Sequence, residues 1–151
     1  MYAKFGAALV SWLETRLAGL GVAVRPSAAP PNDPPPYVSW ERDDYQPGGE
    51  HDARDGFQGL GGFYDVSVVL VVWDTDRVRA DQVVDKIVGT RADPGLVGWR
   101  AWLPTAAAEG KVAVQHCKLS DRPFDGMALP PDGSETRWYS TTLTLEFRYT
   151  E

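Results

Sequence analysis

The stretch from Phe63 to Gly89, "FYDVSVVLVVWDTDRVRADQVVDKIVG", constrains the fold most because it joins two different patterns of apolar residues. Its first half is almost continuously apolar, which predicts a strand buried on one face throughout and on the other face near its end. Its second half places apolar residues three and four positions apart between charges, which predicts a surface helix. At the junction, Asp74 or Asp76 is expected to cap the free N–H groups of that helix.

The rest of the chain predicts one more helix and three more strands. The N-terminal segment carries apolar residues at spacings of three and four up to Leu20 and then Gly21, a pattern typical of an amphipathic helix that ends in glycine. Residues 37–44 predict a short strand and residues 111–119 a longer one. Residues 137–151 alternate apolar and polar side chains most regularly, which predicts a strand with one buried face and one solvent-exposed face.

These elements predict one α+β domain over residues 1–151, with a mainly antiparallel sheet of about four strands and two amphipathic helices packed on one face. Long irregular loops complete it. Residues 25–37 are proline-dense and are interpreted as a stiff extended connector. Residues 45–62, 91–104 and 120–136 are interpreted as irregular, and loops of such length tend to be functional or disordered.

Charge and composition exclude several classes of function. The formal net charge is −6, whereas nucleic-acid binders usually need a basic stripe, so direct DNA binding is not expected. An acidic surface past which DNA slides without sticking is compatible with this charge. The single cysteine excludes an intramolecular disulfide, and no apolar run approaches the ~20 residues of a membrane span. The acidic candidates lie in one loop: Asp43, Asp44, Glu50, Asp52 and Asp55.

Catalytic and metal-binding patterns are weak. His51 lies near Asp52 and Asp55, but two histidines 65 positions apart do not form a recognisable ligand spacing. His116 and Cys117 are neighbours on an expected strand, so their side chains should diverge to opposite faces. The glycines of "GFQGLGGF" precede a strand, whereas phosphate loops lie between a strand and a helix. We therefore expect no catalytic residue, no metal and no cofactor.

Two of the expected loops carry large apolar side chains, which allows two interpretations. The side chains either fold back onto their own core or pack on a neighbouring subunit. The residues concerned are Phe57, Leu60, Phe63, Phe124, Met127 and Leu129. The threonine-rich face of the last strand is either solvent surface or part of an edge that pairs with another chain.

The order of the elements resembles the tail terminator (tail completion) family of long-tailed phages and gene transfer agents. The resemblance rests on an N-terminal helix followed by "PPPYVSWERDD", "YDVSVVLVVWDTD", "RADQVVDKIVG" and a closing "RWYSTTLTLEFRYTE", and it covers residues 1–92 and 111–151. It implies a virion structural protein that assembles in the host cytoplasm into a ring, usually a hexamer, at the head–tail interface.

The same resemblance implies the partners. Such a ring caps the tail tube, ends tube polymerisation and presents a surface to the head-side connector or stopper protein, while DNA passes through its centre without specific binding. Two other interpretations stay open. One is a head-side stopper or connector subunit, and the other is a small cytosolic binding module or metal-dependent enzyme that uses His51, Asp52, Asp55 and His116.

Overall fold

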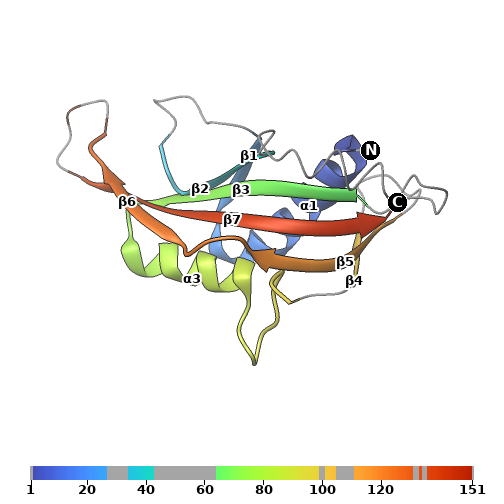
Figure 1. Cartoon of the computed structure of the whole chain (residues 1–151). Coiled ribbons are helices and arrows are strands. Elements are labelled where there is room, and N and C mark those ends of the chain that lie inside the picture. Colours follow the sequence, from blue (N-terminus) through green and yellow to red (C-terminus); the bar gives the residue numbers. More distant parts are fainter. Residues whose placement is uncertain are drawn as a thin grey trace.

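The computed structural model of the chain describes residues 2–26, 34–42, 64–98, 101–104, 111–130, 133 and 136–150. Within these ranges, two α-helices and a short 3-10 helix accompany one sheet of seven strands (Figure 1). In chain order the elements are α1 (Tyr2–Leu17), η1 (Ala18–Leu20), β1 (Ala23–Pro26), β2 (Tyr37–Arg42), β3 (Tyr64–Asp74), α3 (Arg77–Val88), β4 (Ala101–Pro104), β5 (Lys111–Leu119), β6 (Phe124–Ala128) and β7 (Trp138–Thr150).

The predicted α+β class and the mainly antiparallel sheet are confirmed, but the sheet has seven strands instead of about four. The three additional strands are β1, β4 and β6, which contain only four or five residues each. β4 and β6 lie in segments expected to be irregular, and β1 overlaps the start of the expected proline-dense connector. A short strand is formed by pairing with a neighbour and carries little alternation of its own, so the sequence does not reveal it. β1 ends in a proline, which is tolerated on the outermost strand of a sheet.

The sheet is built around the long antiparallel pair of β3 and β7, which runs from Tyr64 opposite Tyr149 to Asp74 opposite Tyr139. The strand order is β1-β2-β3-β7-β5-β4, and β6 lies outside this path beside β7. β5 and β6 follow one another along the same side of β7 (Figure 1). β5 pairs with residues 145–150 of β7, and β6 pairs with residues 138–142.

Alternation along β3 and β7 produces one fully buried face, called here the inner face. Its side chains are at most 5% exposed: Val66, Val68, Leu70, Val72, Leu143, Leu145, Phe147 and Tyr149. Both helices bury their apolar stripes in the same core, so the expected packing of two helices on one face is confirmed. The ring of Phe5 on α1 stacks on Tyr149 at 4.7 Å and meets Phe147 edge-on at 5.0 Å.

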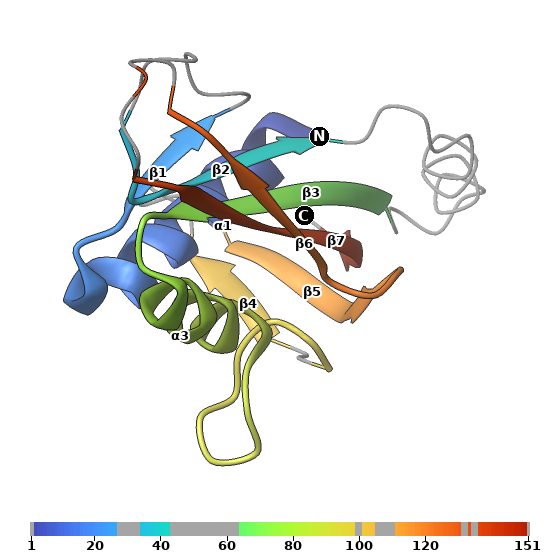
Figure 2. The same ribbon diagram turned by 90° about the vertical axis from the view of Figure 1, so that its left-hand side faces the viewer.

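The two helices lie next to each other (Figure 2), and a specific local feature positions each of them. On α1, a Cβ atom at Gly6 would lie 2.9 Å from the Trp40 ring, so glycine permits the close approach of helix and strand. At the start of α3, the Asp76 carboxylate accepts hydrogen bonds from the N–H groups of Val78 and Arg79, which confirms the expected cap. Neither described helix is long and apolar enough to cross a membrane.

Candidate functional site

The segment from Ser120 to Pro130, called here the β6 ribbon, contains those predicted interface residues that the structure describes. It leaves β5 at Ser120, whose N–H donates to the Thr144 carbonyl at 2.9 Å. It then pairs with β7 from Phe124 opposite Thr142 to Ala128 opposite Trp138. Among the described residues, β6 pairs with no other strand, so its far edge borders the outside of the sheet.

Side-chain contacts hold the β6 ribbon firmly against the body. Asp125 forms an ion pair with Arg77 of α3 at 2.8 Å and accepts a hydrogen bond from the Thr141 hydroxyl at 2.8 Å. Arg77, and then Thr141, hold the pKa of Asp125 below its usual range. At Gly126 a Cβ atom would lie 2.8 Å from the Ser140 hydroxyl, so glycine lets β6 approach β7 closely. These contacts and the pairing with β7 connect the ribbon to the body of the fold.

Three large apolar side chains of the β6 ribbon are turned toward solvent. Phe124, Met127 and Leu129 are 71%, 57% and 73% exposed, and Val78 at the start of α3 is 66% exposed. The first three therefore do not fold back onto their own core, which removes one of the two interpretations for them. Their role in a subunit or tube contact stays a prediction.

The remaining predicted site residues lie outside the described residues. This applies to the other apolar candidates, Phe57, Leu60 and Phe63, and to the acidic candidates Asp43, Asp44, Glu50, Asp52 and Asp55. It also applies to His51. Their predicted roles stay predictions.

The second face of the sheet, called here the outer face, is divided into a charged half and a more apolar half. In the charged half, Arg148 makes two 2.8 Å contacts with the Asp65 carboxylate, and Lys118 lies 3.2 Å from Glu146. In the other half the half-buried side chains of Val71 and Trp73 share the face with Thr142, which lies opposite Phe124. Phe124 therefore extends the apolar half of the outer face to the edge of the sheet.

Among the described residues, the reactive side chains do not come together in one chemical site. His116 is exposed, whereas Cys117 is 2% exposed and lies in the core, so the predicted divergence is confirmed. Burial raises the pKa of the Cys117 thiol to about 12, which keeps it in the non-nucleophilic form at neutral pH. Among the described residues, no group of three His, Cys, Asp or Glu side chains is placed to hold a metal ion.

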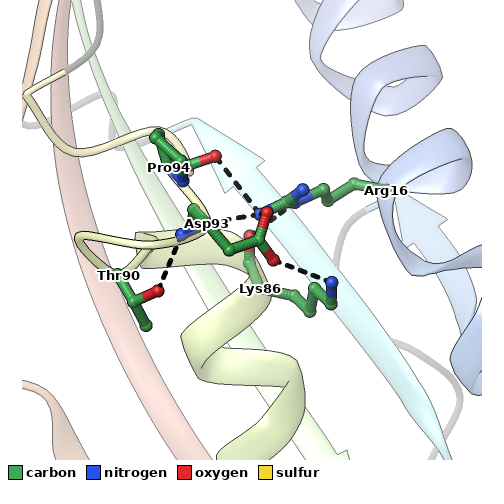
Figure 3. A network of polar contacts seen from close by, with 5 residues as sticks. All are labelled: Arg16, Lys86, Thr90, Asp93 and Pro94. Atoms are coloured by element: carbon green, nitrogen blue, oxygen red, sulfur yellow. Dashed lines mark hydrogen bonds and ion pairs between the residues drawn. The ribbon is translucent and has the colours of Figure 1, made fainter.

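Sequence reasoning missed a polar network that ties the segment from Gly89 to Gly98, called here the 89–98 loop, to both helices (Figure 3). Arg16 of α1 donates to the carbonyl oxygens of Lys86 at 3.0 Å and Pro94 at 3.2 Å, and it contacts the Asp93 carboxylate at 2.9 Å. Lys86 reaches the other oxygen of that carboxylate at 2.8 Å. Lys86 and then Arg16 lower the pKa of Asp93.

Several backbone groups of the 89–98 loop are hydrogen-bonded as well. The N–H of Leu96 donates to the Ile87 carbonyl at 2.8 Å, and the N–H of Gly98 donates to the Cys117 carbonyl at 2.8 Å. Gly89 has a φ of 99° and forms a β-bridge with Pro94. The hydrogen bonds of Arg16 connect residues 70 to 78 positions apart, so no local sequence signal reveals them. The network is structural, because its polar groups are directed at one another.

Comparison with known proteins supports the fold. No protein-family model matches the sequence, and no curated protein matches it. Among solved structures, a chain from the virion of a native gene transfer agent (GTA) particle has the same fold, with a TM-score of 0.51. The two chains are 19% identical, and the match covers 100% of each. The protein therefore has a fold found in a chain of that virion particle.

Proposed function

We propose that the protein is a virion structural protein of the tail terminator kind. In this proposal it forms a ring, with six copies as the expected number, that caps the tail tube, ends tube polymerisation and joins the tail to the head-side connector. The observation that carries the proposal is the whole-length fold match with a chain of a gene transfer agent virion. The order of elements in the sequence supports it independently.

The described surface supports a role in assembly. Ring proteins need surface patches that exclude water when copies meet, and such patches are enriched in aromatic residues and methionine. The β6 ribbon offers Phe124, Met127 and Leu129 on a strand that is anchored to the body through Asp125. An anchored patch loses little conformational freedom on binding, which favours association.

The predicted loops have a place in the same proposal. Phe57, Leu60 and Phe63 join the β6 ribbon as candidate contacts with a neighbouring copy or with the tube. The acidic residues Asp43, Asp44, Glu50, Asp52 and Asp55 line the path of the DNA and lower its adhesion, because like charges repel. Reversing the charge of Asp43, Asp44, Asp52 and Asp55 should slow DNA passage, and unchanged passage would remove this part of the proposal alone.

Negative-stain electron microscopy tests the proposal. The purified protein is imaged at high concentration, alone and after mixing with tail tubes. Rings with a central hole, or caps at one end of the tubes, are the expected result, and the symmetry of the rings gives the copy number. A compact monomer that ignores the tubes would contradict the proposal. Binding of that monomer to head-side proteins in a pull-down would favour the stopper or connector interpretation instead.

A further inference from the structure

The pairing register places β1 and β6 at opposite edges of the sheet and at the same level along the strands. Across the sheet, Val24 pairs with Val38, Val38 with Val72, Val72 with Thr141, and Thr141 with Asp125. At this level the strand order is therefore β1-β2-β3-β7-β6. Within the described residues, β1 pairs only with β2 and β6 pairs only with β7, so both outer strands have one unpaired edge.

The strand directions make these two edges compatible with each other. β6 is antiparallel to β7, β7 to β3 and β3 to β2, whereas β2 and β1 are parallel. β1 and β6 therefore run in opposite directions. When copies are related by rotation about an axis roughly parallel to the strands, β6 of one copy meets β1 of the next in an antiparallel arrangement, which is the more stable form of pairing.

The β6 edge has few of the features that prevent edge pairing. Proteins usually protect an outer strand with exposed lysines, inward charges or a proline within the strand. Here the one charged residue of β6, Asp125, is already engaged with Arg77 and Thr141, while Phe124 and Met127 are exposed beside it. Pro123 and Pro130 flank the strand without interrupting it.

The two edges are also similar in length. β1 has four residues and β6 has five, but Pro26 at the end of β1 has no N–H to donate, so Ala23, Val24 and Arg25 are the residues of β1 that can take part fully in a ladder. These features point to a second copy of the chain as the occupant, because a second copy supplies the complementary edge in the required direction.

We propose that copies of this chain join edge to edge, with β6 of one copy pairing antiparallel to β1 of the next. The contact uses two different surfaces, so it is heterologous, and repetition of a closing rotation produces a ring and not a dimer. This inference rests on the proposed ring function and adds the surface that builds the ring. The sheets of all copies then form one continuous sheet around it.

Thiol crosslinking tests the edge contact. Ala23→Cys and Ala128→Cys are conservative changes on β1 and β6, and their cross-strand partners Tyr37 and Trp138 place both residues on the outer face. Cys117 is buried and stays in place. The variants are treated with a short bismaleimide at a concentration at which rings form, and the products are separated by denaturing electrophoresis. The short linker removes the need for ideal disulfide geometry.

The single variants are the matched controls. The double variant should give a ladder of covalent oligomers that ends at the copy number of the ring. Each single variant should stay monomeric, because a heterologous contact never brings two identical strands together. A mixture of the two single variants should stop at dimers. Thermal unfolding of each variant confirms that it is folded, and Arg25→Cys with Phe124→Cys on the same face repeats the test if the first pair is unstable.

Other outcomes would overturn the inference, and they differ in what they mean for the proposed function. Dimers of Ala128→Cys alone would show that β6 pairs with β6. Rings seen by electron microscopy without a ladder would show that other surfaces build the ring, which leaves the terminator proposal intact. A protein that gives neither rings nor a ladder would contradict both.

Discussion

The 89–98 loop and the β6 ribbon look similar in the sequence but have opposite relations to the rest of the molecule. Both are short segments with glycine and proline that leave a regular element. The 89–98 loop is directed inward: Arg16, Lys86 and Asp93 are engaged with one another, and its backbone bonds to α3 and β5 (Figure 3). The β6 ribbon is anchored at Asp125 and Gly126 and turns its apolar side chains outward.

This difference separates stability from assembly. A segment whose polar and backbone groups are engaged internally contributes to folding, because breaking its contacts leaves groups unpaired. A segment that exposes large apolar side chains gains nothing from them in the isolated chain, but it gains when another surface covers them. Changes in the 89–98 loop should therefore affect unfolding, and changes on the β6 ribbon should affect association.

The largest effect is expected for Gly95→Ala. A Cβ atom at this position would lie 2.5 Å from the Ile87 carbonyl oxygen and 2.6 Å from the Gly89 nitrogen, and backbone atoms cannot move aside as side chains do. We expect a loss of about 3 kcal/mol in the free energy of unfolding. For a chain of this length, that lowers the melting temperature by roughly 6–12 °C. Differential scanning calorimetry measures both quantities.

The control for this change is Gly19→Ala. Nothing lies within 4 Å of a Cβ atom at Gly19, so that variant should be as stable as the natural protein or slightly more stable. Equal melting temperatures for the two variants would show that the 89–98 loop adapts freely, and the contrast with the β6 ribbon would disappear.

A second prediction compares two aspartate–arginine pairs at the start of α3. Asp74 is fully buried and accepts hydrogen bonds from Arg79 at 2.6 and 2.8 Å, whereas Asp125 on β6 is exposed and pairs with Arg77. Asp74→Asn should cost about 2 kcal/mol, because a buried hydrogen-bonded charge is lost. Asp125→Asn should cost less than about 1 kcal/mol, as is typical of an exposed pair. Chemical denaturation at neutral pH measures both.

The same pair predicts a pH dependence. Burial favours the neutral form of Asp74, but hydrogen bonds from Arg79 and from the Asp76 N–H outweigh it and lower its pKa from the ordinary value of 3.8. A lowered folded-state pKa means that the contribution of Asp74 is complete above that ordinary value and is lost as the pH falls through the folded-state pKa. Below about pH 4, the free energies of unfolding of the natural protein and of Asp74→Asn should therefore become more similar as the pH falls. A constant difference would contradict this.

A smaller effect is expected for Arg16→Ala. The change removes hydrogen bonds to the carbonyls of Lys86 and Pro94 and the contact with the Asp93 carboxylate. We expect a loss of about 1 kcal/mol in stability and faster amide hydrogen exchange confined to the 89–98 loop. Arg91→Ala in the same loop is the control, because Arg91 is exposed. If both variants exchange alike, the Arg16 network does not hold the loop.

The sequence predicts those parts of the fold in which periodicity directly reflects burial. The runs around Val68 and Val83 and the alternation ending at Tyr149 have periods that match the buried faces they form. The short strands β1, β4 and β6 are not predictable in this way, because each exists through pairing with a distant segment. For the candidate site, sequence reasoning selected Phe124, Met127 and Leu129 as apolar loop residues. Only the placement of β6 beside β7 shows that they are exposed.

The smallest effect on folding, and the largest on assembly, is expected for Phe124→Lys. The side chain is 71% exposed, so the free energy of unfolding should stay within about 0.5 kcal/mol of the natural value. A lysine on an outer strand opposes edge pairing, so the protein concentration needed for ring formation should rise at least about tenfold. Analytical ultracentrifugation over a concentration series measures this shift.

Val78→Lys is the matched control, because Val78 is 66% exposed but lies on α3. An equal loss of rings in both variants would mean that any added positive charge opposes assembly, whether or not it lies at the β6 edge.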